Sequence, residues 1–221
     1  MAGMRKRYEL LVFDWDGTLM DSTAVIVASL QAACADLGLA VPSEERARHI
    51  IGLGLDDAMA HVLPQVDAAE YPRIVDRYRH HFRLRDPATP LFPGTGDALH
   101  ALNAAGYLLA VATGKSRRGL DRALDSTGLR EVFHATRCGD EASGKPHPGM
   151  LNDLIDMLGT AAGRTLMVGD TTHDLEMARN AGVASVAVAY GAHPREQLVA
   201  HNPLACIGAP HELWQWLERN A

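Results

Sequence analysis

Two aspartates separated by a single residue come directly after the first apolar run of the chain. The run covers residues 8–13, and the motif DWDGT that follows it begins at Asp14. In open parallel sheets, ligands bind where buried strands end, and the glycine of this motif permits a sharp turn after the acids. Acidic residues at such positions are also commonly solvated, or cap the next helix. Asp14 and Asp16 are therefore candidate catalytic carboxylates, to be weighed against the other strand ends.

Two later motifs carry groups suited to holding a phosphoryl group. Thr113 and Gly114 follow a second apolar run, and a hydroxyl with exposed backbone N–H groups near a helix N-terminus can bind a phosphoryl oxygen. Lys145 lies in the motif GKPHP, whose prolines restrict the backbone and hold the ammonium in place. The structural alternatives are a threonine that caps a helix and a lysine in a surface turn. Together the two motifs favour an anion-binding site.

A third strand end supplies two further carboxylates, Asp170 and Asp174. Their spacing of four residues places both on one face of a helix. Carboxylate oxygens are the ligands that Mg²⁺ prefers, although both residues could instead serve the helix N-terminus. Two like charges about 4 Å apart repel by about 4 kcal/mol at an effective dielectric constant of about 20. Aspartates gathered around a phosphate dianion therefore need a divalent cation, and Mg²⁺ is the expected cofactor.

Alternating apolar runs and helical segments must position these side chains. The alternation predicts an α/β fold with a parallel sheet and helices on both of its sides. The predicted strands are residues 8–13, 107–112, 165–168 and 184–189. The predicted helices of this part are residues 95–105, 150–158, 175–181 and 211–219.

The segment between the first two strands is too long for one crossover helix and reads as helical throughout. Helical periodicity covers residues 25–37, 55–63 and 71–84, and no strand-like run stands out. We predict that residues 20–87 form an all-helical insert and that residues 1–19 and 88–221 form the core. The chain would rejoin the core through a hinge near Pro87, Pro90 and Pro93.

Composition and charge exclude several classes of protein. The chain has 221 residues, of which 47% are hydrophobic and 22% charged, so disorder is not its dominant state. A formal net charge of −6 argues against nonspecific nucleic-acid binding, and no apolar stretch approaches the length that spans a bilayer. The three cysteines, Cys34, Cys138 and Cys206, are odd in number and far apart. They predict neither a disulfide framework nor a structural zinc site, and they favour a reducing cytoplasm.

Taken in order, four motifs resemble those of the haloacid dehalogenase superfamily. They are DxDxT from Asp14, Thr113, the Lys-Pro pair at Lys145, and GDxxxD around Asp170. The helical insert is similar to that superfamily's alpha-helical cap. The motif AYG that ends at Gly191, with the helix after it, resembles the phosphoglycolate phosphatase-like branch. The resemblance implies a Rossmann-like, doubly wound core, a cap that opens and closes, and a phosphatase acting on a small phosphorylated molecule.

The resemblance also implies roles for individual residues. Asp14 would be the nucleophile that forms an aspartyl-phosphate, and Asp16 would protonate the leaving oxygen and then activate water. Mg²⁺ would be bound by Asp14, the backbone carbonyl of Asp16 and Asp170, with Asp174 in support. The groups that would hold the transferring phosphoryl group are Thr113, the Gly114 N–H and Lys145.

Single residues distinguish between the other activities of the superfamily. Members of the superfamily that remove halogens lack the second acid of the first motif. Asp16 is present here, so dehalogenation is disfavoured. Phosphonate hydrolysis needs a lysine in the cap, and residues 23–84 contain none. An inactive regulatory protein is disfavoured because the reactive groups are all present. A hexose-phosphate mutase stays open as the main rival.

Substrate choice is expected to lie in the insert. Arg48, His49 and Gly52, the last in a loop over residues 51–54, are candidate contacts to a substrate carboxylate or second phosphate. The alternative is a solvated helix face followed by an ordinary turn. The expected partner is a small-molecule phosphate, with no nucleic acid and no membrane, and the chain is expected to be a monomer or a homodimer.

Overall fold

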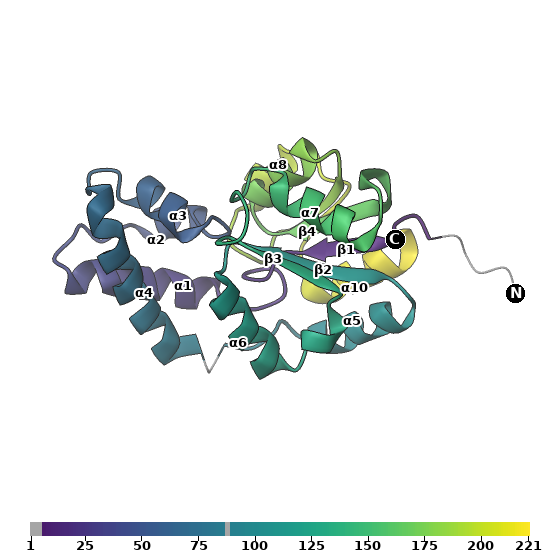
Figure 1. The fold of residues 1–221 in the computed structure, drawn as a ribbon, viewed down its shortest axis with the longest axis horizontal. Coiled ribbons are helices and arrows are strands. Elements are labelled where there is room, and N and C mark those ends of the chain that lie inside the picture. Colours follow the sequence, from purple (N-terminus) through teal and green to yellow (C-terminus); the bar gives the residue numbers. More distant parts are fainter. Residues whose placement is uncertain (1–5, 87–88) are drawn as a thin grey trace, which may run out of the picture.

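A single sheet of six parallel strands forms the centre of the protein (Figure 1). The computed structural model describes residues 6–86 and 89–221. The strands are β1 (Leu10–Phe13), β2 (Leu108–Thr113), β3 (Ala135–Cys138), β4 (Thr165–Gly169), β5 (Ala184–Val188) and β6 (Cys206–Ile207). Their order across the sheet is β3-β2-β1-β4-β5-β6, which confirms the predicted Rossmann-like α/β class.

The order of the strands reverses at β1, and this reversal sets the position of the site. β1 pairs with β2 on one side, where Leu10 is in register with Leu108. It pairs with β4 on the other side, where Phe13 is in register with Val168. Ligands of open parallel sheets bind at the carboxyl ends of the strands beside such a switch point. The segments that follow β1 and β4 therefore emerge next to each other.

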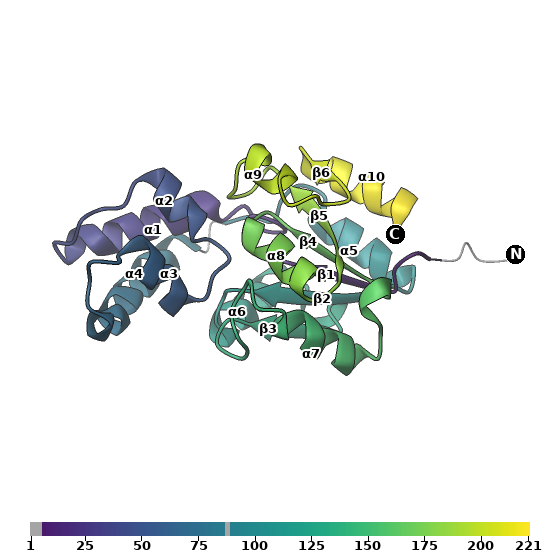
Figure 2. The same ribbon diagram turned by 90° about the horizontal axis from the view of Figure 1, so that it is seen from above.

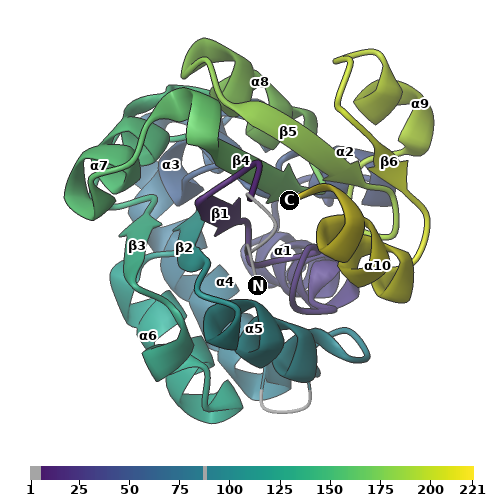
Figure 3. The same ribbon diagram turned by 90° about the vertical axis from the view of Figure 1, so that its right-hand side faces the viewer.

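Helices cover both faces of the sheet (Figure 3). The helices of this part are α5 (Thr95–Ala104), α6 (Arg117–Thr127), α7 (Gly149–Leu158), α8 (Thr172–Asn180), α9 (Arg195–Val199) and α10 (Pro210–Asn220). Alternate residues of β1 point to opposite faces, as the period of a strand requires. Leu11 and Phe13 belong to a core cluster with residues of α5, α6 and α10. Leu10 and Val12 belong to a second cluster with residues of α7 and α8.

A helical insert lies beyond the carboxyl ends of the strands (Figures 1 and 2). Its helices are α1 (Thr23–Asp36), α2 (Glu44–His49), α3 (Leu55–Val62) and α4 (Tyr71–Arg85). They enclose a hydrophobic cluster that is separate from those of the sheet. The two segments that join the insert to the sheet run antiparallel, because Met20 bridges to Leu91 and the Phe92 N–H donates to the Leu19 carbonyl at 2.9 Å.

Short and polar elements were the ones that sequence patterns failed to predict. The four predicted strands are present with ends shifted by one or two residues, whereas the strands β3 and β6 and the polar helix α6 were missed. β3 is an edge strand with two polar residues, and β6 has only 2 residues. α8 begins at Thr172 instead of residue 175, because its first turn carries the polar residues of the acidic motif.

Three short 3-10 helices within the described residues connect these elements. They cover Ala68–Glu70, Arg130–Val132 and Ala162–Arg164. None of the helices in residues 6–86 and 89–221 is both long enough and apolar enough to cross a membrane. The predicted hinge residue Pro87 and the boundary at residues 87 and 88 lie outside the described residues, as do residues 1–5.

Leu11 offers a direct test of the packing of β1. Its side chain is fully buried in the cluster under α5, α6 and α10. We expect Leu11→Ala to lower the free energy of unfolding by about 2–5 kcal/mol, because it removes apolar contacts and leaves a cavity. Urea denaturation measures this change, with Leu204→Ala as the control because Leu204 is 48% exposed. Equal midpoints for the two variants would contradict the packing described.

Candidate active site

The carboxyl ends of β1 and β4 bring three carboxylates together, and we call Asp14, Asp170 and Asp174 the acidic cluster. One oxygen from each lies within 4.8 Å of the others, and all three side chains are fully buried. Asp14 continues the pairing of β1, since its N–H donates to the Val168 carbonyl at 2.9 Å. Asp170 follows β4, and Asp174 lies in the first turn of α8. The sheet topology therefore joins the first and last acidic motifs of the sequence.

A single buried ammonium accompanies the acidic cluster. Lys145 Nζ lies 2.7 Å from Asp14 Oδ1 and 2.6 Å from Asp174 Oδ1. These are ion-pair distances, although neither contact has the angles of a hydrogen bond. Three charged carboxylates and one ammonium leave two net negative charges in a buried site. Burial consequently raises the pKa of Asp14 to about 7, with the Asp174 charge adding to the effect and Lys145 opposing it. The pKa of Asp170 is raised well above its usual range, also mainly by burial.

The residues present fit a divalent cation. The two unbalanced negative charges match a charge of +2, and hard carboxylate oxygens are the donors that Mg²⁺ prefers. Both carboxylate oxygens of Asp14 are buried and make no hydrogen bond within the described residues. A buried polar atom without a partner is costly, and a metal ion or a substrate would satisfy it.

Hydrogen bonds fix the other two carboxylates of the acidic cluster. Asp170 Oδ1 accepts from Thr18 Oγ1 at 2.8 Å, and its Oδ2 accepts from the Ala192 N–H at 2.7 Å. Asp174 Oδ2 accepts from the N–H and the hydroxyl of Thr171, at 3.1 and 2.7 Å. Thr171 and Asp174 form the capping box that begins α8. The Asp174 carboxylate thus caps the N-terminus of α8 and also contacts Lys145.

Two glycines allow the chain to pass close to Asp170. Gly17 has a φ of +81°, and a Cβ added there would lie 2.2 Å from Asp170 Oδ2. A Cβ added at Gly191 would also lie 2.2 Å from that oxygen. Both glycines come from motifs quoted above, and their role is to leave room for the carboxylate.

Asp16 faces the cavity beside a residue that the sequence analysis did not assign. Asp16 Oδ1 accepts from Ser22 Oγ at 2.6 Å and lies 2.8 Å from Lys115 Nζ. The same ammonium lies 4.7 Å from the centre of the Phe82 ring, which belongs to α4 of the insert. Lys115 therefore joins the first motif, the end of β2 and the insert. Its place directly after Thr113 and Gly114 is the signal in the sequence that could have identified it.

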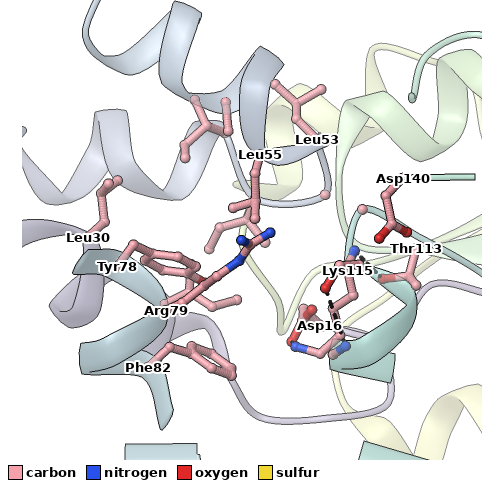
Figure 4. Close-up of a pocket in the computed structure, with 18 of the residues that line it drawn as sticks. Asp16, Leu30, Leu53, Leu55, Tyr78, Arg79, Phe82, Thr113, Lys115 and Asp140 are labelled. Atoms are coloured by element: carbon pink, nitrogen blue, oxygen red, sulfur yellow. Dashed lines mark hydrogen bonds and ion pairs between the residues drawn. The ribbon is translucent and has the colours of Figure 1, made fainter. Parts of the chain in front are cut away.

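A cavity of about 330 Å³ opens between these side chains and the insert (Figure 4). Asp14, Asp16, Thr113 and Gly114 line it from the side of the sheet. Thr113 ends β2, and its side chain is buried. At Gly114 the insert makes its close approach to the sheet, because an added Cβ would lie 2.4 Å from the Leu53 carbonyl oxygen.

The three insert residues singled out from the sequence separate into two places. Gly52 lines the cavity. Arg48 and His49 line a second hollow next to residues 189–194. Arg48 Nη1 donates to the Gly191 carbonyl at 3.4 Å, and the His49 ring stacks on His193 with centroids 5.1 Å apart. These two side chains join the insert to the core and do not face the acidic cluster.

Two core histidines complete this contact by binding one carbonyl of the insert. His173 Nε2 and His193 Nε2 lie 2.8 and 3.1 Å from the His49 carbonyl oxygen. His193 Nδ1 accepts from the Thr172 N–H, so Nε2 carries the proton and donates. Burial lowers the pKa of His193 to about 4 and also lowers the pKa of His173. Both rings are therefore neutral near pH 7.

Comparison with known protein families identifies the family of this chain. A model of the family described as "Haloacid dehalogenase-like hydrolase" matches residues 11–188. The chain belongs to this family. The resemblance stated from the motifs is thereby confirmed.

Relatives within the haloacid dehalogenase-like hydrolases carry phosphatase names. "Probable phosphatase IndB" of Dickeya dadantii is 37% identical over 216 residues, covering 92% of this chain and 94% of that protein. A phosphoglycolate phosphatase of Agrobacterium fabrum is 35% identical over 188 residues, covering 82% of this chain and 81% of that protein. A solved structure described as a predicted phosphoglycolate phosphatase from Haemophilus somnus has a TM-score of 0.85 at 25% identity, covering 96% and 99% of the two chains. The chain is accordingly a phosphoric monoester hydrolase of the haloacid dehalogenase-like type.

Gly191→Ala tests whether the close approach to Asp170 matters for this hydrolase. The new Cβ would force Asp170 or the 189–192 segment to move, so we expect a stability loss of about 1–3 kcal/mol. Phosphatase activity should fall at least tenfold, because Asp170 would leave its place in the acidic cluster. Gly163→Ala is the matched control, since nothing lies within 4 Å of its added Cβ. Thermal melts and phosphate release measure both effects, and a Gly191→Ala enzyme as active as the control would refute the role given to this contact.

Proposed function

We propose that this protein is a Mg²⁺-dependent phosphatase that hydrolyses small-molecule phosphate monoesters through an aspartyl-phosphate on Asp14. The observation that carries the proposal is the buried Asp14 carboxylate. It has no hydrogen bond within the described residues, it faces a cavity, and it lies beside Lys145 and two further carboxylates. A carboxylate held in this way is available to a metal ion and to an electrophile.

The metal would be held by Asp14, the backbone carbonyl of Asp16 and Asp170. Asp174 supports the site indirectly, because Thr171 donates to its Oδ2 and its Oδ1 lies 2.6 Å from the Lys145 ammonium. When bound, Mg²⁺ neutralises negative charge, so that a carboxylate and a phosphate dianion can approach each other. The protein contributes the fixed positions of these ligands.

Asp14 and Asp16 have different roles, since one forms the covalent bond to phosphorus and the other transfers protons. A carboxylate oxygen of Asp14 attacks phosphorus, and the bond from phosphorus to the leaving oxygen breaks. Asp16 gives its proton to that oxygen and then takes a proton from the water that hydrolyses the aspartyl-phosphate. The products are an alcohol and inorganic phosphate, and Asp14 is regenerated. Ser22 and Lys115 hold Asp16 Oδ1 in the cavity during both steps.

Three further groups are placed to hold the transferring phosphoryl group. Thr113 and Gly114 line the cavity at the end of β2, and the Lys145 ammonium lies 2.7 Å from the proposed nucleophile. Hydrogen-bond donors fixed in a buried site stabilise the charge of the transition state more strongly than water does. Arg118 and Arg122 also line the cavity and supply positive charge to it, although the chain as a whole is acidic.

The names of the relatives support hydrolysis rather than transfer of phosphate between sugars. We further propose that residues 20–87 form a cap over a core made of residues 1–19 and 88–221. The separate hydrophobic cluster of the insert and its paired connections support this division. The three unpaired cysteines, two of them buried, support a location in a reducing cytoplasm.

Asp14→Asn tests the nucleophile. An amide has nearly the same shape but cannot form the acyl-phosphate, so turnover should fall by at least about a thousandfold. The circular dichroism spectrum should not change. Asp156→Asn, on the exposed side of α7, is the matched control and should keep full activity. Appreciable turnover by Asp14→Asn would refute the assignment of the nucleophile.

The affinity for Mg²⁺ should depend steeply on pH. The pKa of Asp14 is raised to about 7, so at pH 5 this carboxyl binds a proton that it must release to bind a metal, and the raised pKa of Asp170 adds to the competition between protons and metal. Between pH 8 and pH 5 we expect the affinity to fall by roughly ten- to a hundredfold. Calorimetric titration of the metal-free protein measures this, and Asp170→Ala should bind weakly at both pH values. An affinity that does not change with pH would contradict the proposed ligands.

A further inference from the structure

The cavity of about 330 Å³ has two walls of different chemistry (Figure 4). The wall on the side of the sheet is formed by charged, hydroxyl-bearing and glycine residues, among them Asp16, Thr113 and Lys115. The wall on the side of the insert is mainly apolar. Its side chains include Leu30, Leu53, Leu55, Met59, Tyr78 and Phe82. A ligand that fills the cavity must therefore be polar at one end and apolar at the other.

The apolar wall is built from separate parts of the insert. Leu30 comes from α1, Leu55 and Met59 from α3, and Phe82 from α4. Figure 4 shows Leu30, Leu55 and Phe82 on the insert side of the cavity and Asp16 and Lys115 on the sheet side, with the Arg79 side chain reaching between them. Three charged residues of α4, Asp76, Arg79 and Arg83, also line the cavity from this side, and Arg79 lies 3.6 Å from Asp76 as an exposed ion pair. Burial raises the pKa of the Tyr78 phenol, so its hydroxyl is neutral at ordinary pH.

The size of the cavity adds to this argument. A volume of about 330 Å³ lies in the range of pockets that hold drug-sized molecules, with mostly apolar linings. The two-carbon acid named in the descriptions of several relatives offers almost no apolar surface to such a wall. This small acid would leave the insert wall in contact with water or with an empty space, and neither contributes binding energy.

We propose that the leaving group of the substrate is apolar, an aliphatic chain or an aromatic ring that packs against the insert wall. This inference rests on the proposed phosphatase function and places the phosphate at the polar wall, next to Asp14. The apolar part then lies against Leu30, Leu55 and Phe82. The buried surface of the leaving group, rather than a second charged group, sets which esters are hydrolysed fastest.

A series of n-alkyl phosphates isolates this effect. Ethyl, butyl, hexyl and octyl phosphate have leaving alcohols of nearly equal acidity, so the chemical step stays constant while the apolar surface grows. We expect kcat/KM to rise by about threefold to fourfold per methylene until the cavity is filled. Hexyl phosphate should exceed phosphoglycolate at least tenfold. A flat series, or a preference for phosphoglycolate, would overturn the inference.

Binding measurements separate this inference from the proposed function. Alkylphosphonates of the same lengths are stable analogues, and calorimetry in the presence of Mg²⁺ gives their affinities without any turnover. If no ester is hydrolysed, the phosphatase proposal fails, yet affinities that rise with chain length still support the apolar site. Affinities independent of length refute the apolar site, whatever the turnover.

Leu55→Gln locates the effect in the insert wall. Leu55 is only partly buried, so an amide of similar size should be tolerated by the fold. We expect kcat/KM for hexyl phosphate to fall about tenfold, while that for ethyl phosphate stays within about twofold. Leu84→Gln is the matched control, because Leu84 is 68% exposed on α4 and should leave both values unchanged. An equal loss for both esters in Leu55→Gln would show a general structural effect and contradict the proposal.

Discussion

The burial of three carboxylates with only one ammonium is the constraint on which the rest of the site depends. Isolated charges in a protein interior are strongly disfavoured, and one lysine compensates only one of the three. The surrounding chain therefore supplies fixed donors, from Thr18 and Ala192 to Asp170 and from Thr171 to Asp174. Asp14 is the exception, since its oxygens stay without hydrogen bonds within the described residues. Burial raises the pKa values of Asp14 and Asp170, so protons and a metal ion compete for the same carboxyls.

Sheet topology brings these charges together, and much of it follows from the sequence. Apolar runs that each end at Asp14, Thr113 or Asp170 predict strands whose carboxyl ends share one edge of a parallel sheet. The reversal at β1 then makes β1 and β4 neighbours. Lys145 was identifiable because two prolines follow it closely, although its contacts with two carboxylates were not. Contacts of this kind depend on the direction of side chains across the sheet, which local patterns do not encode.

The helices of the insert could be predicted from the sequence, but the direction of its side chains could not. Helical periodicity identified α1, α3 and α4, because each presents an apolar face to a common cluster. This periodicity gave no information on how the hydrophobic cluster of the insert is oriented relative to the sheet. Arg48 and His49 have the right chemistry to meet an anion, yet α2 directs them to Gly191 and His193 instead. Lys115 shows the opposite case, since its link between Asp16 and Phe82 exists only once the insert is in place.

The apolar wall of the cavity belongs to the same cluster that holds the insert together. Leu30, Met59 and Phe82 are buried members of that cluster and also line the cavity. A change that alters which leaving group fits must therefore also alter the packing of the insert, and core substitutions usually cost stability. Asp14, Asp170 and Lys145 are held by the sheet and its loops and are largely free of this coupling, whereas Asp16 is bound by Ser22 of the insert and by Lys115, which contacts Phe82. Partly exposed positions such as Leu55 escape most of the coupling, so selectivity can change there at the lowest cost in stability.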